Sequence, residues 1–525
     1  MKIRQHIMSL LLLTSIPLGM CFGQATKPAS EEKAKGAVPE ANLDWIERID
    51  KIHEPGYMDW TTAAWAMMFI KQGIIRTKDA PQVARAVLDL WDQPGSESNS
   101  WIYCFKADRY FIKTLGEEAG GRVMMARTVP PARQMLEVRH QLMKQICQIY
   151  DLQEVMLDLA EQHTNTIMPG YTHFRHAQPT TFGHYLLSVF DAIGRSTKTI
   201  EDGYHLMSLN EMGCGALAGT SWPIDRDLVS QYLGMEGLIE NANDAVSYTD
   251  GYLVVVCGLT NVTNITSRTA LEMSYWSGVE YDLLEIGGHR GTSFMMPQKA
   301  SNPVGMELIR AHAGQMVGHL TEVAVGGLRT PHGDAFEMLY MGEPTLAAIQ
   351  TAEKCTSKLT KELSKLQVHR ERMLALIRES YICATELANQ IVRDYDVGYR
   401  TAHEIVNEFV LVSLERQIPA TKARMELLDE AAQKVLGRKL GMSEASLREL
   451  LDPAYFISVT NSRGGVAPEE AARMIADRRQ KLADARNRHL ERIETLEQAQ
   501  ERMIADLKAT CGTAGRPPEV QSDGQ

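Results

Sequence analysis

Apolar residues recur at intervals of three and four positions through most of the chain, which is the spacing of amphipathic helices. Proline is poorly tolerated inside a helix, and its absence from residues 224–296 and 345–418 predicts long helices in both intervals. Val304–Val325 and Thr181–Ile193 continue the pattern just after a proline, where helices often begin. A last long helix is expected from Pro468 to about residue 508. Because strand signals are scarce, we predict an all-α chain in which helical regions flank a long central bundle.

The first residues have the layout of a secretory signal peptide. Lys2 and Arg4 precede the apolar run Met8–Leu13, and small residues follow near Gly23. The run is too short for a membrane span, and Pro17 interrupts it. We therefore expect export to the periplasm or the extracellular space, with no membrane attachment after cleavage.

The chain divides further by composition, because residues 24–40 and the last residues are polar and rich in small side chains, as linkers and tails are. The predicted parts are a signal peptide (1–25), a linker (26–43), an N-terminal helical domain (44–126), a central bundle domain (127–385), a C-terminal helical domain (386–511) and a disordered tail (512–525).

Composition and charge exclude several classes of function. The 525 residues are 44% hydrophobic and 23% charged, as in ordinary globular proteins, and the formal net charge is −11. A nucleic-acid partner is not expected, because such proteins need clustered Lys and Arg to displace phosphate counterions. No pair of cysteines has the two-residue spacing of a zinc ribbon, so no metal site is predicted.

Three segments depart from the helical pattern. The first, Met168–Pro179, is predicted to be a polar loop between two prolines, and it carries Thr172, His173 and Gln178. A lone histidine in such a place would ordinarily be structural. Several hydrogen-bonding groups together, next to the start of a helix, favour a binding site instead.

The other two segments lie farther along the chain. Gly213–Asp225 is rich in glycine and alanine, so its backbone can approach a ligand closely, although a tight connection between helices has the same composition. Gly291–Pro303, followed by Glu307, places Lys299 and Asn302 on a loop between two predicted helices. Such a loop can exclude water and bring donors to an anion. A simple hinge is the alternative, but a hinge seldom needs Lys, Asn and Ser together.

The third segment resembles the signature loop of the fumarase and aspartase superfamily, in which a hydroxyl-bearing Gly segment precedes Met-Pro-x-Lys-x-Asn and then Glu. The runs Pro169–His173 and Gly215–Thr220 narrow the resemblance to argininosuccinate lyase and its close relatives. The resemblance spans about residues 116–468. It implies a three-domain all-α fold in which the long central helices form a twenty-helix core in a homotetramer. Each active site would then draw on three subunits.

The resemblance also implies a reaction, the anti elimination that breaks a C–N or C–O bond of a succinyl compound and releases fumarate. No metal or organic cofactor is required. Ser293 matches the base that removes the carbon proton, and Lys299 would lower its pKa. Lys299 and Asn302 would stabilise the carbanion, while His173, paired with Glu307, would protonate the leaving group. The substrate contacts that the resemblance implies are Thr172, Asn302, Asn241, Arg127, Thr128 and Gln178.

The chain departs from its relatives in the signature loop. Relatives have one residue between the Ser pair and Met-Pro, and this chain has Phe294 and Met295 there. Counting back from Met296 would put Phe294 in the position of the base. Ser293 is preferred because only it can carry a proton.

A second departure concerns the substrate. Val129, Pro130 and Pro131 replace polar residues that help relatives to bind argininosuccinate, and Thr330–Asp334 resembles the branch that cleaves other N-substituted aspartates, such as ethylenediamine-disuccinate. Export also fits poorly with cytosolic arginine synthesis. We therefore expect C–N bond cleavage in an N-substituted aspartate, with another member of this class favoured over argininosuccinate itself. The alternatives are a non-catalytic binding or structural homologue and a C–O lyase that acts on a malyl compound.

Overall fold

The computed structural model describes residues 40–92, 103–127, 131–287, 302–328, 330–333 and 336–512, all within one compact unit that spans Val38–Gln525. The predicted signal peptide, most of the predicted linker and the residues after Gly512 lie outside this part. The first helix begins at Glu40, inside the range predicted as linker.

The helices and strands follow one another along the chain in three groups. The N-terminal group is α1 (Glu40–His53), α2 (Tyr57–Lys71), α3 (Ala80–Asp92), α4 (Tyr103–Leu115) and α5 (Glu117–Gly120). The central group is α6 (Pro131–Gln162), β1 (Ile167–Thr172), β2 (Arg175–Thr181), α7 (Phe182–Met207), β3 (Leu209–Asn210), α8 (Arg226–Leu233), β4 (Gly237–Leu238), α9 (Ala242–Val246), α10 (Asp250–Trp276), β5 (Leu284–Glu285), α11 (Val304–Leu328), α12 (Phe336–Leu339) and α13 (Gly342–Leu363). The C-terminal group is β6 (Gln367–Val368), α14 (Arg370–Arg378), α15 (Ala384–Tyr395), α16 (Tyr399–Glu415), the 3₁₀ turn η1 (Ala420–Lys422), α17 (Met425–Leu436), α18 (Glu444–Leu450), α19 (Pro453–Val459) and α20 (Pro468–Gly512).

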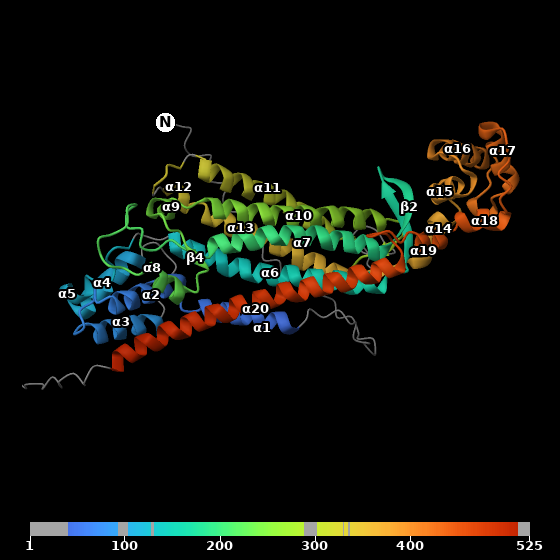
Figure 1. Cartoon of the computed structure of the whole chain (residues 1–525). Coiled ribbons are helices and arrows are strands. Elements are labelled where there is room, and N and C mark those ends of the chain that lie inside the picture. The colour runs from blue at the N-terminus through green and yellow to red at the C-terminus, as the bar shows by residue number, and fades with distance from the viewer. Residues whose placement is uncertain are drawn as a thin grey trace, which may run out of the picture. The chain divides into compact units, whose positions relative to one another are not determined.

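The long helices α6, α7, α10, α11 and α13 pack along one another as the central bundle (Figure 1). Their buried apolar residues form one large hydrophobic cluster together with those of α2 and α3. The prediction of an all-α fold with a long central bundle is confirmed.

The last helix, α20, packs against α1, α3 and α6, so its buried stripe joins the large cluster. A second hydrophobic cluster, between Leu387 and Leu451, holds α15 to α18 together. The predicted C-terminal domain, 386–511, thus contributes residues to both clusters. The domain boundaries given above remain predictions.

Several predicted helices match the structure. α11 begins at Val304 and α20 at Pro468, as expected, and α10 lies inside the first proline-free interval. α7 begins at Phe182 because the side chain of Thr181 accepts a hydrogen bond from the backbone N–H of His184 and so caps the helix.

The prediction of long helices in residues 345–418 is met by α13 and α16, but the interval also contains the shorter helices α14 and α15. Proline is only one of the signals that end a helix. β6 interrupts the interval by pairing with β5, and Asp396 ends α15 in the left-handed conformation, with φ 53°.

The predicted polar loop Met168–Pro179 is also corrected, because most of it forms the antiparallel hairpin of β1 and β2. Pro169 lies opposite Pro179, and both prolines are tolerated because each strand of a two-stranded ribbon is an edge strand. The strands approach closely at Gly170, where a Cβ would lie 2.5 Å from the carbonyl oxygen of Gln178. Local sequence favoured a loop, and pairing between the two halves of the segment made it a hairpin.

Candidate active site

The β1–β2 hairpin carries Thr172 and His173 at its tip. Thr172 pairs with Arg175, so His173 and Phe174 form a two-residue turn, and both have positive φ, at 53° and 58°. Turns of this kind usually use Asn and Gly, because other residues pay a steric cost in the left-handed region. Thr172 and His173 are both exposed, and Phe174 is 79% exposed. The fold therefore holds His173 at an exposed, strained turn.

Aromatic side chains support the base of this hairpin. The ring of Tyr171 stacks on Trp276 of α10, with centroids 6.4 Å apart, and Trp276 meets Tyr185 of α7 edge to face at 4.8 Å. Burial raises the pKa of Tyr171 to about 12, so its hydroxyl stays protonated at neutral pH. On β2, Gln178 donates from Nε2 to Oγ1 of Thr385 at 3.2 Å. The hairpin is thus anchored to the central bundle and to α15.

Two more predicted site residues lie at the start of α11. Asn302 precedes the helix and its carbonyl oxygen accepts the N–H of Val304 at 2.8 Å. Glu307 stands exposed in the first turn. A Cβ added at Gly305 would clash with the side chain of Glu362 near the end of α13, which places these elements together. Ser293 and Lys299 lie outside the described residues.

The start of α11 and the hairpin lie at the same end of the bundle. Arg370, at the start of α14, donates to the carbonyl oxygen of Gln162 at the end of α6, and β1 follows α6 directly. In the described part of the chain no hydrogen bond or ion pair joins His173 to Glu307. Their pairing stays a prediction.

Arg127 and Asn241 lie elsewhere. Arg127 donates to the hydroxyl oxygens of Thr61 and Thr62 on α2, the latter at 2.8 Å, which fixes its guanidinium against the N-terminal helices. Thr128 lies outside the described residues. Asn241 caps α9, and its Oδ1 accepts the N–H of Asn243 at 2.9 Å. Since the oxygen is used in the cap, only the Nδ2 donors of Asn241 are left for a carboxylate.

The predicted residues therefore form two sets within one chain. The hairpin set is Thr172, His173, Gln178, Asn302 and Glu307, and the loop set is Arg127 and Asn241. Arg127 precedes α6 and the hairpin follows it, and a helix of 32 residues is about 48 Å long. Figure 1 shows α9 and β2 at opposite ends of the bundle. A single small dicarboxylate cannot contact both sets in one chain.

Arg226 is a residue that the sequence did not single out. Its guanidinium donates to the backbone carbonyl oxygens of Met212 at 2.7 Å, Ile239 at 2.8 Å, Glu240 at 2.9 Å and Glu211 at 3.2 Å. Two of these carbonyls directly precede the glycine-rich segment Gly213–Asp225, and the other two directly precede Asn241. Arg226 therefore connects the two segments. The sequence feature that could have pointed to Arg226 is its position directly after Asp225, which caps α8.

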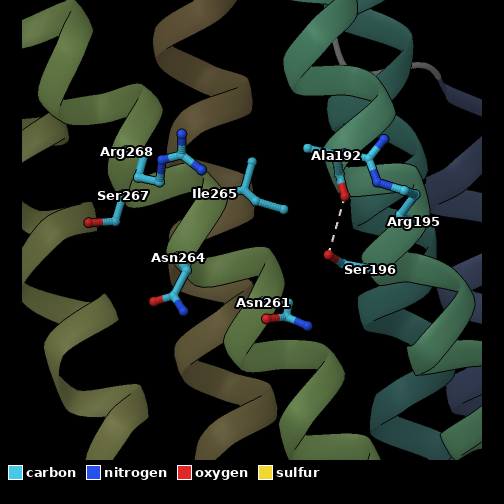
Figure 2. A pocket seen from close by; sticks show the side chains of 8 residues that line it. All are labelled: Ala192, Arg195, Ser196, Asn261, Asn264, Ile265, Ser267 and Arg268. Atoms are coloured by element: carbon cyan, nitrogen blue, oxygen red, sulfur yellow. Dashed lines mark hydrogen bonds between the residues drawn. The ribbon is translucent and has the colours of Figure 1, made fainter. Parts of the chain in front are cut away.

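A pocket of about 650 Å³ lies between α7 and α10, away from both sets (Figure 2). Arg195 borders it from α7, and Asn261, Asn264 and Arg268 project from α10. None of the described predicted site residues lines it. These residues lie near the middle of both helices, so the pocket is between the two sets.

The described residues contain no group of three or more His, Cys, Asp or Glu side chains that could hold a metal ion. In the same part of the chain no helix combines the length and apolarity that crossing a membrane requires.

Comparisons with known proteins agree with this architecture. A family model described as Lyase matches residues 131–318, and one described as Argininosuccinate lyase C-terminal matches residues 381–458. The argininosuccinate lyase of Methanosarcina barkeri is 31% identical over 433 residues, which cover 80% of this chain and 86% of the relative. The argininosuccinate lyase 1 of Shouchella clausii is 30% identical over 449 residues, which cover 83% and 89%.

A solved structure of an EDDS lyase variant with bound fumarate has a TM-score of 0.77 and 25% identity, and the match covers 91% of this chain and 97% of that one. The fold and the family models define a lyase of the fumarase and aspartase superfamily. Within that superfamily, the chain belongs to the argininosuccinate lyase-like family. The resemblance seen in the sequence motifs is confirmed.

Proposed function

We propose that the protein is a carbon–nitrogen lyase that releases fumarate from an N-substituted aspartate, at a site assembled from several copies of the chain. The observation that carries the proposal is the separation of the hairpin set from the loop set by the length of α6. Copies that run antiparallel bring the hairpin end of one chain to the loop end of another. The substrate then meets both sets, as the superfamily resemblance implies.

Exposed apolar residues on the bundle support this assembly. Val317 and Val325 of α11 are 53% and 57% exposed, and Tyr275 of α10 is 53% exposed. Large apolar side chains gathered on neighbouring helices favour a surface that other subunits cover. We therefore propose a homotetramer in which α10 and α11 face partner chains.

The proposed elimination has two proton transfers, one from the substrate carbon and one to the leaving nitrogen. Ser293, as the alkoxide, takes the proton from the carbon next to a carboxylate, and Lys299 and Asn302 stabilise the negative charge that develops there. The C–N bond then breaks, and its electrons leave with the nitrogen. His173, paired with Glu307, gives that nitrogen a proton. The products are fumarate and a free amine.

The proposed substrate class follows from the residues next to Arg127. Val129, Pro130 and Pro131 cannot make the polar contacts that argininosuccinate requires. The similarity to an EDDS lyase over 91% of the chain supports a different N-substituted aspartate.

The test is a fumarate assay. Purified protein is incubated with N-substituted aspartates, argininosuccinate and malyl compounds, and fumarate is followed by its absorbance. We expect release from at least one N-substituted aspartate, a loss of about a thousandfold or more in Ser293→Ala and a similar loss in His173→Gln. Ser188→Ala, on α7, is the control.

Three outcomes would contradict parts of the proposal. Equal rates for wild type and Ser293→Ala would refute Ser293 as the base. Release from malyl compounds only would indicate a C–O lyase. No turnover by an intact tetramer would indicate the non-catalytic homologue.

We also propose that the chain is exported, on the basis of its N-terminal sequence. Expression of the full chain with N-terminal sequencing of the periplasmic fraction tests this. Mature protein that starts near Gly23 supports export, and an intact Met1 in the cytoplasm contradicts it.

A further inference from the structure

A groove of about 530 Å³ runs between α6, α7 and α20, within the range of small-molecule sites. It is distinct from the hairpin set and from the loop set, since none of their residues lines it. Its walls are drawn from residues 150–153, 190–201 and 478–488, so only folding brings them together.

Positive charge is concentrated in this groove although the chain is acidic. Its lining holds five cationic side chains and two carboxylates, against a formal net charge of −11 for the chain. Both carboxylates are engaged: Asp191 binds Arg478 at 2.7 Å, and Glu201 accepts the hydroxyl of Tyr150 at 2.7 Å. The groove therefore has cationic side chains in excess.

Three of the cations have no partner in the described part of the chain. Arg195, Lys198 and Arg488 make no hydrogen bond or ion pair there. They come from two helices and line one groove, and Arg195 also borders the pocket between α7 and α10. The carboxylate of Glu201 offsets only part of this positive charge, so a bound anion would lower the repulsion that remains among the cations.

A buried amide gives a second, independent indication of a ligand. Gln153 lines the groove and is only 4% exposed, yet within the described residues its side chain makes no hydrogen bond. Its amide atoms are not sealed from solvent, so they are open to water or to a ligand that occupies the groove.

Gly194, which lies next to the amide of Gln153, keeps the groove open. Gly194 lies inside α7, where glycine is about 1 kcal/mol less favourable than alanine. A Cβ at this position would lie 3.4 Å from Nε2 of Gln153. A larger side chain would therefore cover the amide, and glycine leaves it accessible.

The groove also has an apolar side. Phe190 and Leu482 line it and are 6% and 4% exposed. Both side chains already pack in the hydrophobic cluster, and the small exposed edge of each faces the groove, where the carbon skeleton of an organic anion would cover it.

We propose that this groove binds a small organic anion with two or more negative groups, either carboxylates or phosphates. Arg195, Lys198 and Arg488 bind the negative groups, Gln153 donates to one of them, and Phe190 contacts the carbon skeleton. The site is separate from catalysis and does not depend on the proposed function.

Isothermal titration calorimetry of the full protein at low salt tests the proposal, with citrate as the carboxylate probe and fructose 1,6-bisphosphate as the phosphate probe. We expect at least one probe to bind once per chain, with affinity that falls as salt rises. Lys198→Gln/Arg488→Gln should weaken binding by about tenfold or more, because two charge-assisted contacts are lost. Gly194→Leu should abolish binding by filling the groove.

The control is Lys439→Gln/Lys508→Gln, which removes the same charge from exposed lysines outside the groove and should bind like wild type. Failure of both probes to bind at millimolar concentration would overturn the proposal. Equal binding by wild type and both groove variants would overturn it as well. Probe binding that is lost in Arg127→Gln, a variant of the loop set, but unchanged in both groove variants would place the anion in the catalytic site instead, and the proposal would then be wrong.

Discussion

Arg226 fixes the backbone next to the loop set, so removing its side chain should disturb the loop set more than the helix bundle. It donates four hydrogen bonds to backbone carbonyls on two separate segments. A hydrogen bond to a charged group contributes about 1.5 to 3 kcal/mol, so four fully buried bonds would contribute about 6 to 12 kcal/mol. The side chain is half-buried, and the freed carbonyls regain some water. We therefore expect Arg226→Met to lower the free energy of unfolding by about 3 kcal/mol.

Function should change together with stability, because Arg226 holds the carbonyls of Ile239 and Glu240 directly before Asn241. If Asn241 binds a substrate carboxylate, Arg226→Met should raise KM more than it lowers kcat. Arg226→Lys keeps the charge but loses the planar fork, so it should fall between wild type and Arg226→Met.

The assay is urea unfolding at one fixed protein concentration, since assembly also contributes to stability. Arg424→Met is the matched control, because Arg424 is exposed and its side chain makes no hydrogen bond or ion pair within the described residues. It should change stability by less than about 0.5 kcal/mol. The reasoning is refuted if Arg226→Met is no more destabilising than Arg424→Met.

Three further predictions concern local features. Thr181→Ala removes the cap of α7 and should cost about 1 kcal/mol in urea unfolding, whereas Thr181→Ser, which keeps the oxygen, should cost much less; equal losses would contradict the cap. Phe174→Gly relieves a left-handed residue and should slow hydrogen exchange in the hairpin, while faster exchange would mean that the ring contact with Tyr275 matters more. Burial lowers the pKa of His489 from 6.5 to about 3. Between these pH values the unfolded chain binds a proton that the folded chain does not, so the wild-type protein loses stability as the pH falls. His489→Phe lacks this loss, so the stability difference between the two proteins should shrink from pH 7 to pH 5, and parallel curves would contradict the argument.

Part of the candidate site could be predicted from short stretches of sequence. The signature segment before Glu307 and the run Pro169–His173 contain their chemistry within a few residues, so they are visible without any tertiary contact. Arg226 could not be found in this way. Its role comes from carbonyls 13 to 15 positions away, at residues 211 and 239 among others, and backbone carbonyls leave no trace in a sequence.

The groove between α6, α7 and α20 was equally hidden. Tyr150, Arg195 and Arg488 are far apart in the chain, and α20 by itself had only the composition of a solvated helix. The arrangement of unpaired cations around one buried glutamine exists only after α20 has packed on the bundle.

The sequence by itself determined the all-α class, the long central helices and the superfamily, because helical periodicity and the signature motifs involve residues close together in the chain. The tertiary structure decided what depends on contacts between distant residues. It turned the polar segment at 168–179 into a hairpin, placed the two sets of site residues at opposite ends of α6, and gathered the cationic groove. The physical reason is that a helix follows from its neighbouring residues, whereas a site follows from which surfaces the packed helices bring together.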